Sequence, residues 1–418
     1  MRRHLGVLAG GLAAVGFLKA WRLPNRWAAT NFVLNYSQGF VRRGLVGEVA
    51  RRLFGDAAFH YWLFVVFAFL VMAATAGALL WLCRRALAGR SGEGGALELG
   101  ILVFLASPAL VMLVHLVGYL DYLGLLFVTA FAALRAPPRR KWLGYWVAAL
   151  AGPLLALVHE AQTILFMPVV LFVLACRELA EAQRAPAADE RSSLMRTGRV
   201  ALALAAVLAL ALGVSAFVSS SGDPQRVAAL DRWLHQRADF TLHYGVARAL
   251  KTGSPVGLLD MMWSFWTAPG RAIWWFKALI LFLPSFAFLG LVGWRAIGAA
   301  ERASRLERGA LRALFLLACL SPLSLNVVAW DYARWFALAV TNALVCLLAL
   351  HAGCQVSSRH EAGGASLLPL AAALTIGLGL ASDAILFNSA RVSYYPFFDQ
   401  WQALGALVES GKLPLPPD

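Results

Sequence analysis

The sequence predicts an all-α fold, a polytopic transmembrane helical bundle of about eleven spans. Two observations lead to this fold class. The chain has 418 residues, of which 60% are hydrophobic and only 14% are charged, with a mean hydropathy of +0.68. A soluble domain carries about 25% charged residues. Apolar runs close to the ~20 residues needed to cross a bilayer also recur along the whole length. We therefore expect a single integral membrane domain over residues 1–418.

The spans follow one another with short connections between most of them. The first is expected at 5–20, and because Lys19-Ala20-Trp21 is a poor cleavage site, we interpret it as an uncleaved span. The others are expected at 59–83, 97–117, 119–135, 142–158, 161–177, 199–218, 272–294, 311–329, 332–351 and 366–387.

Basic residues set the orientation. Lysine and arginine gather in every second connection, which by the positive-inside rule lies in the cytoplasm. The formal charge of +15 then reflects these loops and a few special arginines, and it does not indicate a nucleic-acid partner. We expect a multi-pass protein of the bacterial cytoplasmic (inner) membrane, with the N-terminus in the cytoplasm and the C-terminus outside it. The basic connections contain Arg84, Arg85, Arg90, Arg139, Arg140, Lys141, Arg177, Arg184, Arg191, Arg196, Arg199, Arg295, Arg302, Arg305, Arg308 and Arg312.

The opposite face collects the unusual polar residues. It holds the extracytoplasmic loops 21–58 and 219–271, in which we expect short amphipathic helices, and the extracytoplasmic tail 388–418. We interpret loop 219–271 as a lid or acceptor-binding element. The polar turns at Asp121, at His159-Glu160 and at 330–335 lie on this same face. A topology chosen only from cytoplasmic charge thus indicates one extracytoplasmic active site.

The segment Asn35–Glu48, NYSQGFVRRGLVGE, is the strongest candidate for ligand binding. Arg42 and Arg43 lie there among three glycines, with Tyr36 and Gln38 nearby. Arginine near a bilayer is costly unless it reaches water, a carboxylate or a phosphate. Guanidinium groups match phosphate oxygens, and glycine allows close approach of the backbone. We expect these four side chains to bind a phosphate-bearing, lipid-linked substrate.

An interfacial amphipathic helix is the alternative interpretation of this loop. Its arginines would touch lipid headgroups. This alternative suits Arg51 and Arg52 well, but it suits Gly39–Gly47 poorly because glycine at this density disfavours a helix.

Three polar turns supply further candidates, each with a structural alternative. Asp121 is a candidate catalytic carboxylate or a helix N-cap. His159 and Glu160 interrupt about 35 apolar residues. His159 is a candidate substrate-binding residue, and Glu160 is either a catalytic carboxylate or the structural partner of an arginine. Asp331 and Arg334 are spaced i,i+3, which allows either an intrahelical ion pair or phosphate binding by Arg334 with Asp331 orienting it.

Other chemistry has little support in the sequence. No Walker A loop, HExxH, GxSxG, CxxC or EF-hand pattern is present. No metal ligands are assigned, and although a divalent cation is compatible with the sequence, nothing requires one. Five cysteines fall in or beside expected spans and indicate no disulfide framework. Because no nucleotide-binding pattern is present, any sugar donor would be lipid-linked rather than nucleotide-activated.

The chain resembles the GT-C superfamily of polytopic glycosyltransferases in its span count, its first extracytoplasmic loop and its polar motifs on one face. It also resembles uncharacterised bacterial envelope-glycan membrane proteins that carry GFVRRGL, a mid-chain His-Glu pair and an Asp-x-x-Arg-Trp turn. These motifs correspond to Gly39–Leu45, His159-Glu160 and Asp331–Trp335. The resemblance implies transfer of a sugar from a polyprenyl-phosphate-linked donor to a glycan or lipid acceptor outside the cytoplasm.

One departure from GT-C enzymes concerns the catalytic acid. Such enzymes generally carry an acidic residue early in the first extracytoplasmic loop, whereas amides, Asn31 and Asn35, stand there in this chain. The base is then expected at Glu48, Asp121 or Glu160. Two other functions remain open: an oligosaccharide polymerase or ligase acting on undecaprenyl-diphosphate chains, and a non-catalytic lipid or glycan transporter, which would favour polar residues distributed through the spans.

Overall fold

A computed structural model gives the arrangement of residues 2–88, 95–134, 141–184, 190–220, 223–251, 271–327, 331–356 and 367–381, with Trp263, Thr267 and Gly405 as isolated positions. These residues are almost entirely helical, with one isolated β-bridge between Ala300 and Val356. The all-α fold class is therefore confirmed. The expected tail 388–418 lies outside the described residues apart from Gly405, as does most of 252–270 within loop 219–271.

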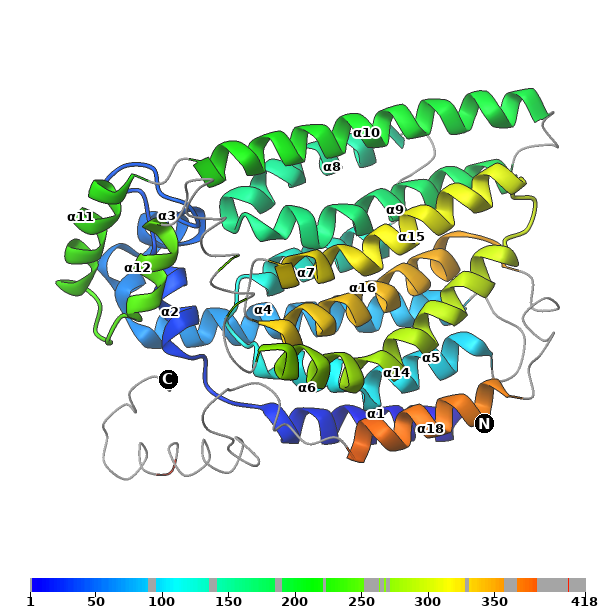
Figure 1. Cartoon of the computed structure of the whole chain (residues 1–418), viewed down its shortest axis with the longest axis horizontal. Helices are drawn as coiled ribbons and strands as arrows, with labels where there is room; N and C mark the ends of the chain where they lie inside the picture. Colours follow the sequence, from blue (N-terminus) through cyan, green and yellow to red (C-terminus); the bar gives the residue numbers. More distant parts are fainter. Residues whose placement is uncertain are drawn as a thin grey trace.

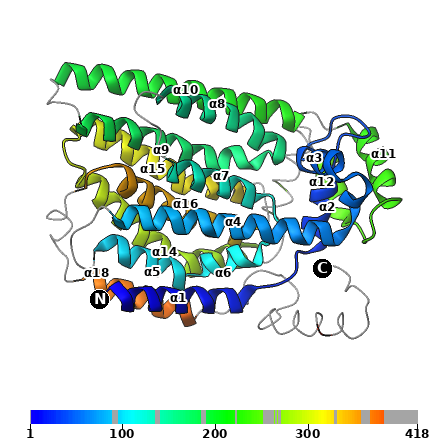
Figure 2. The same cartoon turned by 180° about the vertical axis from the view of Figure 1, so that it is seen from behind.

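Most of the molecule is one bundle of helices that run roughly side by side (Figures 1 and 2). In chain order its helices are α1 (Arg2–Ala20), α4 (Tyr61–Ala88), α5 (Ala96–Ala106), α6 (Pro108–His115), α7 (Asp121–Ala133), α8 (Lys141–Val158), α9 (Ala161–Arg184), α10 (Glu190–Ser220), α14 (Arg271–Gly298), α15 (Arg305–Ser324) with a short 3-10 turn η3 (Leu325–Val327), α16 (Tyr332–Gly353) and α18 (Leu368–Ala381).

Helix α16 forms the centre of the bundle. It packs against α4, α9, α14 and α15, and nearly every residue from Tyr332 to Leu350 is buried. Its one buried amide, Asn342, donates to the carbonyl oxygens of Leu165 on α9 (2.8 Å) and Ala318 on α15 (3.0 Å). A buried polar group that is not hydrogen-bonded is costly, so these bonds fix the register of three helices.

Each of the eleven expected ranges overlaps a helix within the described residues, with one difference. The range 97–117 contains two helices, α5 and α6, which meet at an angle of 51°. Ser107 and Pro108 cause the break, because Ser107 caps α6 and proline is favoured in the first turn of a helix.

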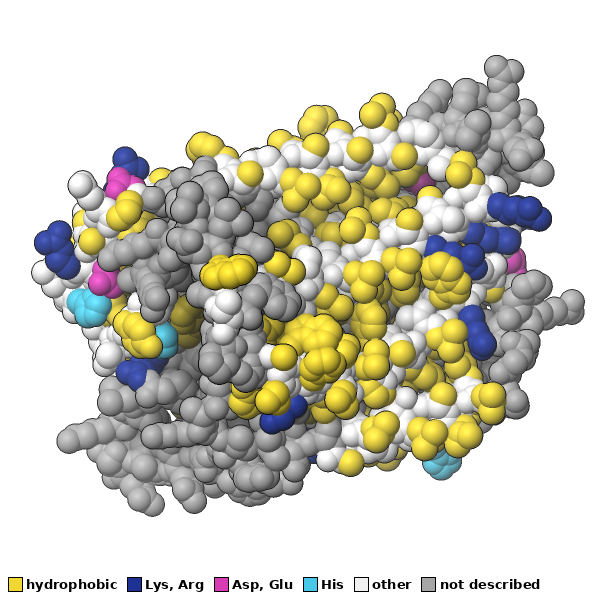
Figure 3. Space-filling model, in the orientation of Figure 1, with side chains coloured by type: hydrophobic (Ala, Val, Ile, Leu, Met, Phe, Trp, Pro, Cys, Tyr) yellow, Lys and Arg dark blue, Asp and Glu magenta, His cyan; other side chains and the backbone are white. Residues whose placement is uncertain are grey.

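Among the residues that the structure describes, five helices are long and apolar enough to cross a membrane, or six if the bent pair counts as one span. They are Tyr61–Ala88, Ala161–Arg184, Ala272–Gly298, Arg305–Val327 and Tyr332–Gly353. Five shorter apolar helices lie beside them, within α1, α7, α8, α10 and α18. The protein thus fits a multi-pass membrane protein, while the count of eleven spans stays a prediction. Exposed apolar side chains cover the middle of the bundle, and basic ones gather where α14 and α15 meet (Figure 3).

A second, smaller group of helices covers one end of the bundle (Figure 1). It consists of α2 (Arg26–Val33), α3 (Leu45–Phe54), the 3-10 turn η1 (Gly55–Phe59), α11 (Pro224–His235) and α12 (Tyr244–Lys251). We call these five elements the head. Although nearly 170 residues separate its two parts along the chain, they share one apolar core that includes Phe32, Phe59, Val227 and Leu234.

Polar contacts also join the two parts of the head. The hydroxyl of Thr30 accepts from the backbone N–H of His243 at 2.8 Å. Asp239 accepts from the backbone N–H of Tyr61 at 2.8 Å and contacts the ring of His60 at 3.0 Å. The short amphipathic helices expected in loops 21–58 and 219–271 therefore form a single body at the end of the bundle where α7, α9 and α16 begin (Figure 2).

Candidate functional site

The candidate site lies where the head meets the bundle. Its first component is the turn Leu34–Gly44 between α2 and α3, which we call the arginine turn. Two glycines shape this turn. A Cβ at Gly47 would lie 2.1 Å from the carbonyl oxygen of Leu34, and one at Gly44 would lie 2.5 Å from the ring of Tyr36. Arg43 has a φ of 63°, in the left-handed region that non-glycine residues rarely adopt. Such conformations cost free energy and cluster at functional sites.

Arg43 makes a two-pronged contact with Glu160, a residue in the turn between α8 and α9. Its Nε donates to the two carboxylate oxygens at 3.2 and 3.0 Å, and its Nη2 donates to Oε1 at 2.5 Å. The neighbouring Arg42 is buried, places Nη1 3.8 Å from the same oxygen, and donates from Nη2 to the carbonyl of Leu250 at 2.8 Å. Two guanidinium groups from one turn thus gather at a single carboxylate.

His159 and Glu160 differ in charge because of these neighbours. Burial, together with the charge of Arg43, lowers the pKa of the His159 imidazole to about 3, so the ring is neutral at ordinary pH. Its Nδ1 accepts from the N–H of Ala161 at 3.1 Å. Burial by itself would raise the pKa of Glu160, but the charge and hydrogen bonds of Arg43, with the charge of Arg42, hold it well below its usual range. Glu160 is therefore ionised.

A second ion-pair cluster joins the first turns of α7 and α16. Arg334 is buried and donates from Nε to Asp121 at 2.5 Å and from Nη1 to Asp331 at 3.1 Å. Its guanidinium also lies over the rings of Tyr119 (5.1 Å) and Trp335 (4.5 Å). The expected pairing of Asp331 with Arg334 is therefore present, and Asp121 is a second partner from another helix.

Asp121 and Asp331 differ in access. Asp121 is almost fully buried, and its side chain makes no helix-capping bond; its second oxygen, Oδ1, has no hydrogen-bond partner in the structure. The side chain of Asp331 is 55% exposed. Asp331 is thus the carboxylate of this cluster that solvent or a ligand reaches most readily.

The two clusters are neighbours. Gln162, two residues after Glu160, donates from Nε2 to the carbonyl of Leu120 at 2.6 Å, directly before Asp121. The charges of Arg43, Glu160, Arg334 and Asp121 also all act on His159. The polar turns expected on one face therefore do lie together at one end of the bundle.

Glu48 lies on α3 and has other partners. Its carboxylate accepts from Arg51 at 2.8 and 3.1 Å, from Arg52 at 2.7 Å, and from the N–H of Tyr36 at 3.2 Å. The hydrogen bond from Arg51, with those from Arg52 and Tyr36, lowers the pKa of Glu48 to about 2. Glu48 therefore fixes the start of the arginine turn to α3. The interfacial alternative for Arg51 and Arg52 stays open, because Arg52 is mostly exposed.

The remaining predicted residues line the same turn. The ring of Tyr36 stacks on Phe40 with centroids 5.3 Å apart, and burial, followed by the charge of Glu48, raises the pKa of its hydroxyl to about 12. Gln38 is half-buried in the turn. Gln162 and the carbonyl of Leu250 are site residues that the sequence reasoning missed. Gln162 had a signal, since it continues the polar interruption HEAQT, whereas a backbone carbonyl leaves none.

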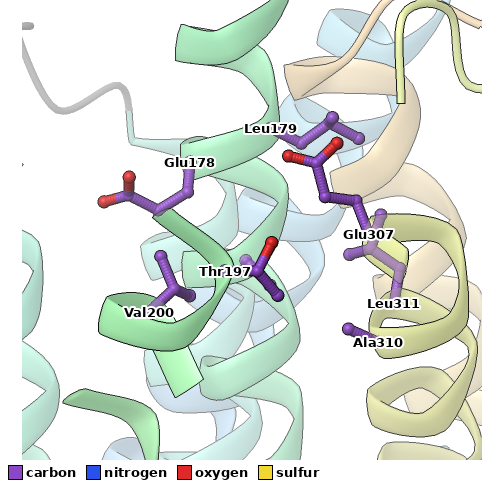
Figure 4. A pocket seen from close by; sticks show the side chains of 8 residues that line it. Glu178, Leu179, Thr197, Val200, Glu307, Ala310 and Leu311 are labelled. Carbon is purple, nitrogen blue, oxygen red and sulfur yellow. The ribbon is translucent and has the colours of Figure 1, made fainter. Parts of the chain in front are cut away.

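Within the described ranges, no group of three or more His, Cys, Asp or Glu side chains is placed to hold a metal ion. A pocket lies near the opposite end of the bundle, between α9, α10 and α15 (Figure 4). Its two carboxylates have structural partners: Glu178 accepts from the Tyr145 hydroxyl and Glu307 from the N–H of Ser304. This pocket is separate from the arginine clusters.

Comparison with protein-family models, curated proteins and solved structures finds no match for this chain. The functional assignment therefore rests on the residues of the site and on their geometry.

Proposed function

We propose that this protein is an integral membrane glycosyltransferase that moves a sugar from a polyprenyl-phosphate donor to an envelope glycan or lipid acceptor. The observation that carries the proposal is the pair Arg42 and Arg43, which share one carboxylate at the end of an apolar bundle. Charged groups in such a setting are expensive and are retained for a ligand or a reaction. An anionic headgroup on an apolar chain matches both the arginines and the lipid-facing helices.

The arginines would neutralise the departing phosphate. A guanidinium binds two phosphate oxygens at once, and its charge is worth most where charge develops during the reaction. Arg42, Arg43 and Glu160 together carry a net charge of +1, so the turn attracts an anion. Arg334 forms ion pairs with Asp121 and Asp331. In this proposal it stabilises the site and does not contact the phosphate directly.

A carboxylate would complete the reaction. The acceptor hydroxyl attacks the anomeric carbon, the bond from this carbon to the phosphate oxygen breaks, and the polyprenyl phosphate leaves with the electron pair. The hydroxyl proton passes to the carboxylate, a role worth roughly 10²–10⁴-fold in rate. Glu160, Asp121 and Glu48 are the candidates. Attack opposite the leaving group inverts the anomeric centre.

The proposed setting is the extracytoplasmic face of a bacterial inner membrane. The support is the run of basic connections far from the head, although loop 21–58 of the head is also rich in arginine. The head contains the arginine turn, and its helix α12 contacts the turn through the bond from Arg42 to the carbonyl of Leu250. The head, whose two parts pack on one core, is the proposed acceptor-binding element.

The test is transfer by purified protein in vesicles that hold a polyprenyl-phosphate sugar. An increase in acceptor mass is expected for the wild type, and its loss is expected in Arg42→Ala and Arg43→Ala variants that still insert into the membrane. Normal transfer by both variants would contradict the proposal. Movement of labelled lipid with no change of mass would instead indicate the transporter. Transfer of whole chains from a diphosphate carrier would indicate the polymerase or ligase.

A further inference from the structure

The carboxylate of Glu160 occupies the position in which an anionic ligand would meet the arginine turn. Arg43 reaches it with Nε and Nη2, the same two-pronged geometry that guanidinium groups use for phosphate. Arg42 approaches the same oxygen at 3.8 Å. The contact joins segments 117 residues apart in the chain, so it depends on the folded bundle rather than on local sequence.

We propose that Glu160 is an internal counter-ion, which holds the phosphate position of Arg42 and Arg43 until a phosphoryl group displaces it. The ligand class is a phosphate monoester or diphosphate. The choice of this class rests on the proposed function, but the exchange itself requires no transfer reaction.

Charge favours the exchange. Because His159 is neutral, Arg42, Arg43 and Glu160 carry one net positive charge between them. A phosphate monoester carries about −1.5 to −2 at neutral pH. It therefore offers the two guanidinium groups more charge than the single carboxylate, and it offers three acceptor oxygens in place of two.

The backbone at Arg43 also fits a site built for exchange. Its φ of 63° is unfavourable for a residue with a Cβ. The surrounding turn enforces it, since Gly44 and Gly47 pack directly on Tyr36 and on the Leu34 carbonyl. The backbone of Arg43 is consequently fixed, and its side chain keeps pointing toward the α8–α9 turn when the carboxylate of Glu160 is displaced.

Displacement of Glu160 by a phosphoryl group would favour Glu160 over Glu48 as the carboxylate that accepts the proton. Once a phosphate has taken Arg43, Glu160 loses the charge that holds its pKa low, while its buried position still raises that pKa. A phosphoryl group bound to Arg43 thereby raises the proton affinity of an otherwise inert carboxylate beside it. The pKa of Glu48 would not rise in this way, because its hydrogen bonds from Arg51, Arg52 and Tyr36 remain in place.

Ligand affinity tests the proposal directly. The full-length protein in detergent is titrated with a polyprenyl phosphate, with a diacyl phosphatidic acid and with inorganic phosphate. Glu160→Gln removes the competing charge at constant shape, so we expect at least about tenfold tighter binding than wild type. Glu160→Asp keeps the charge but shortens the reach to Arg43, so its affinity should lie between the two.

The matched control is Glu178→Gln. It makes the same chemical change at a half-buried carboxylate near the other end of the bundle, where Glu178 accepts from Tyr145 (Figure 4). Its phosphate affinity should equal that of wild type.

The outcomes separate cleanly. Equal or weaker binding by Glu160→Gln overturns the proposal, and if that variant does not fold, equal or weaker binding by Glu160→Asp does so. Tightening for all three ligands supports exchange with the phosphate group alone, and tightening only for the polyprenyl phosphate supports exchange with the lipid-linked form. Because binding is measured without acceptor, a failed transfer assay would overturn the proposed function and leave this result standing.

Discussion

Arg334 and Asp121 form a buried ion pair across 213 residues of sequence, with Nε 2.5 Å from the carboxylate. The pair ties the first turn of α16, the central helix, to the first turn of α7. Removing one partner of a buried pair leaves an uncompensated charge, which costs about 3–5 kcal/mol.

Asp121→Asn should therefore lower the melting temperature in detergent substantially. The double variant Asp121→Leu/Arg334→Met, which replaces both charges with apolar side chains, should recover most of this loss. Thermal unfolding of the three proteins measures it. A double variant that melts below the single variant would contradict the assignment of the pair as a buried structural unit.

His159 predicts a dependence of stability on pH. Its pKa of about 3 in the folded protein lies below the ordinary 6.5, so below pH 6.5 the unfolded chain binds a proton that the folded protein does not. Its contribution is complete above pH 6.5 and declines as the pH falls toward 3. The slope from one such group is at most about 1.4 kcal/mol per pH unit.

Melting temperatures between pH 7.5 and 5 measure this slope, and His159→Gln should reduce it. Glu160 and Glu48 do not interfere in this window, because their lowered pKa values affect stability only below about pH 4.3. An unchanged slope in His159→Gln would show that the imidazole does not titrate as described.

Gly47 predicts a steric requirement in the arginine turn. A Cβ there would lie 2.1 Å from the Leu34 carbonyl and 2.5 Å from that of Phe32, both backbone atoms that cannot move aside cheaply. Gly47→Ala should therefore displace the turn and reduce phosphate affinity at least about tenfold, which corresponds to a loss of at least about 1.4 kcal/mol. Gly77→Ala on α4 is the control, since open space surrounds Gly77. Equal affinity for the two variants would contradict the packing.

The orientation of the bundle predicts a labelling pattern. Tyr244, at the start of α12, is 82% exposed on the head, and Glu301, between α14 and α15, is exposed at the other end. In intact spheroplasts a membrane-impermeant maleimide should label Tyr244→Cys and reach Glu301→Cys only after permeabilisation. The native cysteines are replaced first. The reverse pattern would place the head in the cytoplasm.

The sequence predicted the helices better than it predicted their lengths and partners. Composition and apolar runs place a helix at each expected range, because twenty apolar residues have few alternatives to a buried helix. The break at Ser107 was missed, since it lies inside a continuous apolar run and depends on one serine cap. Span number is open for a related reason: the 13-residue helix α7 is shorter than a bilayer is thick.

The site was predicted in its residues but not in its pairing. Lone charges in apolar surroundings mark Arg42, Arg43 and Glu160 in the sequence, because such charges need partners. Which arginine meets which carboxylate depends on how the α8–α9 turn lies against the head, and no local pattern encodes that. Glu48 illustrates the limit, since its pairing with Arg51 and Arg52 follows from helical spacing, yet its bond to Tyr36 does not.

The bond from Arg42 to the carbonyl of Leu250 gives the head a thermodynamic role. This carbonyl is in the last turn of α12, so one guanidinium is held by the head through Nη2 while Nη1 faces the carboxylate of Glu160. A movement of α12 would change the position of Arg42, and an anion that pulls on Arg42 would act on α12. Binding of a ligand to the head and binding of an anion to the arginine turn are then thermodynamically coupled. Each ligand must change the affinity for the other by the same factor.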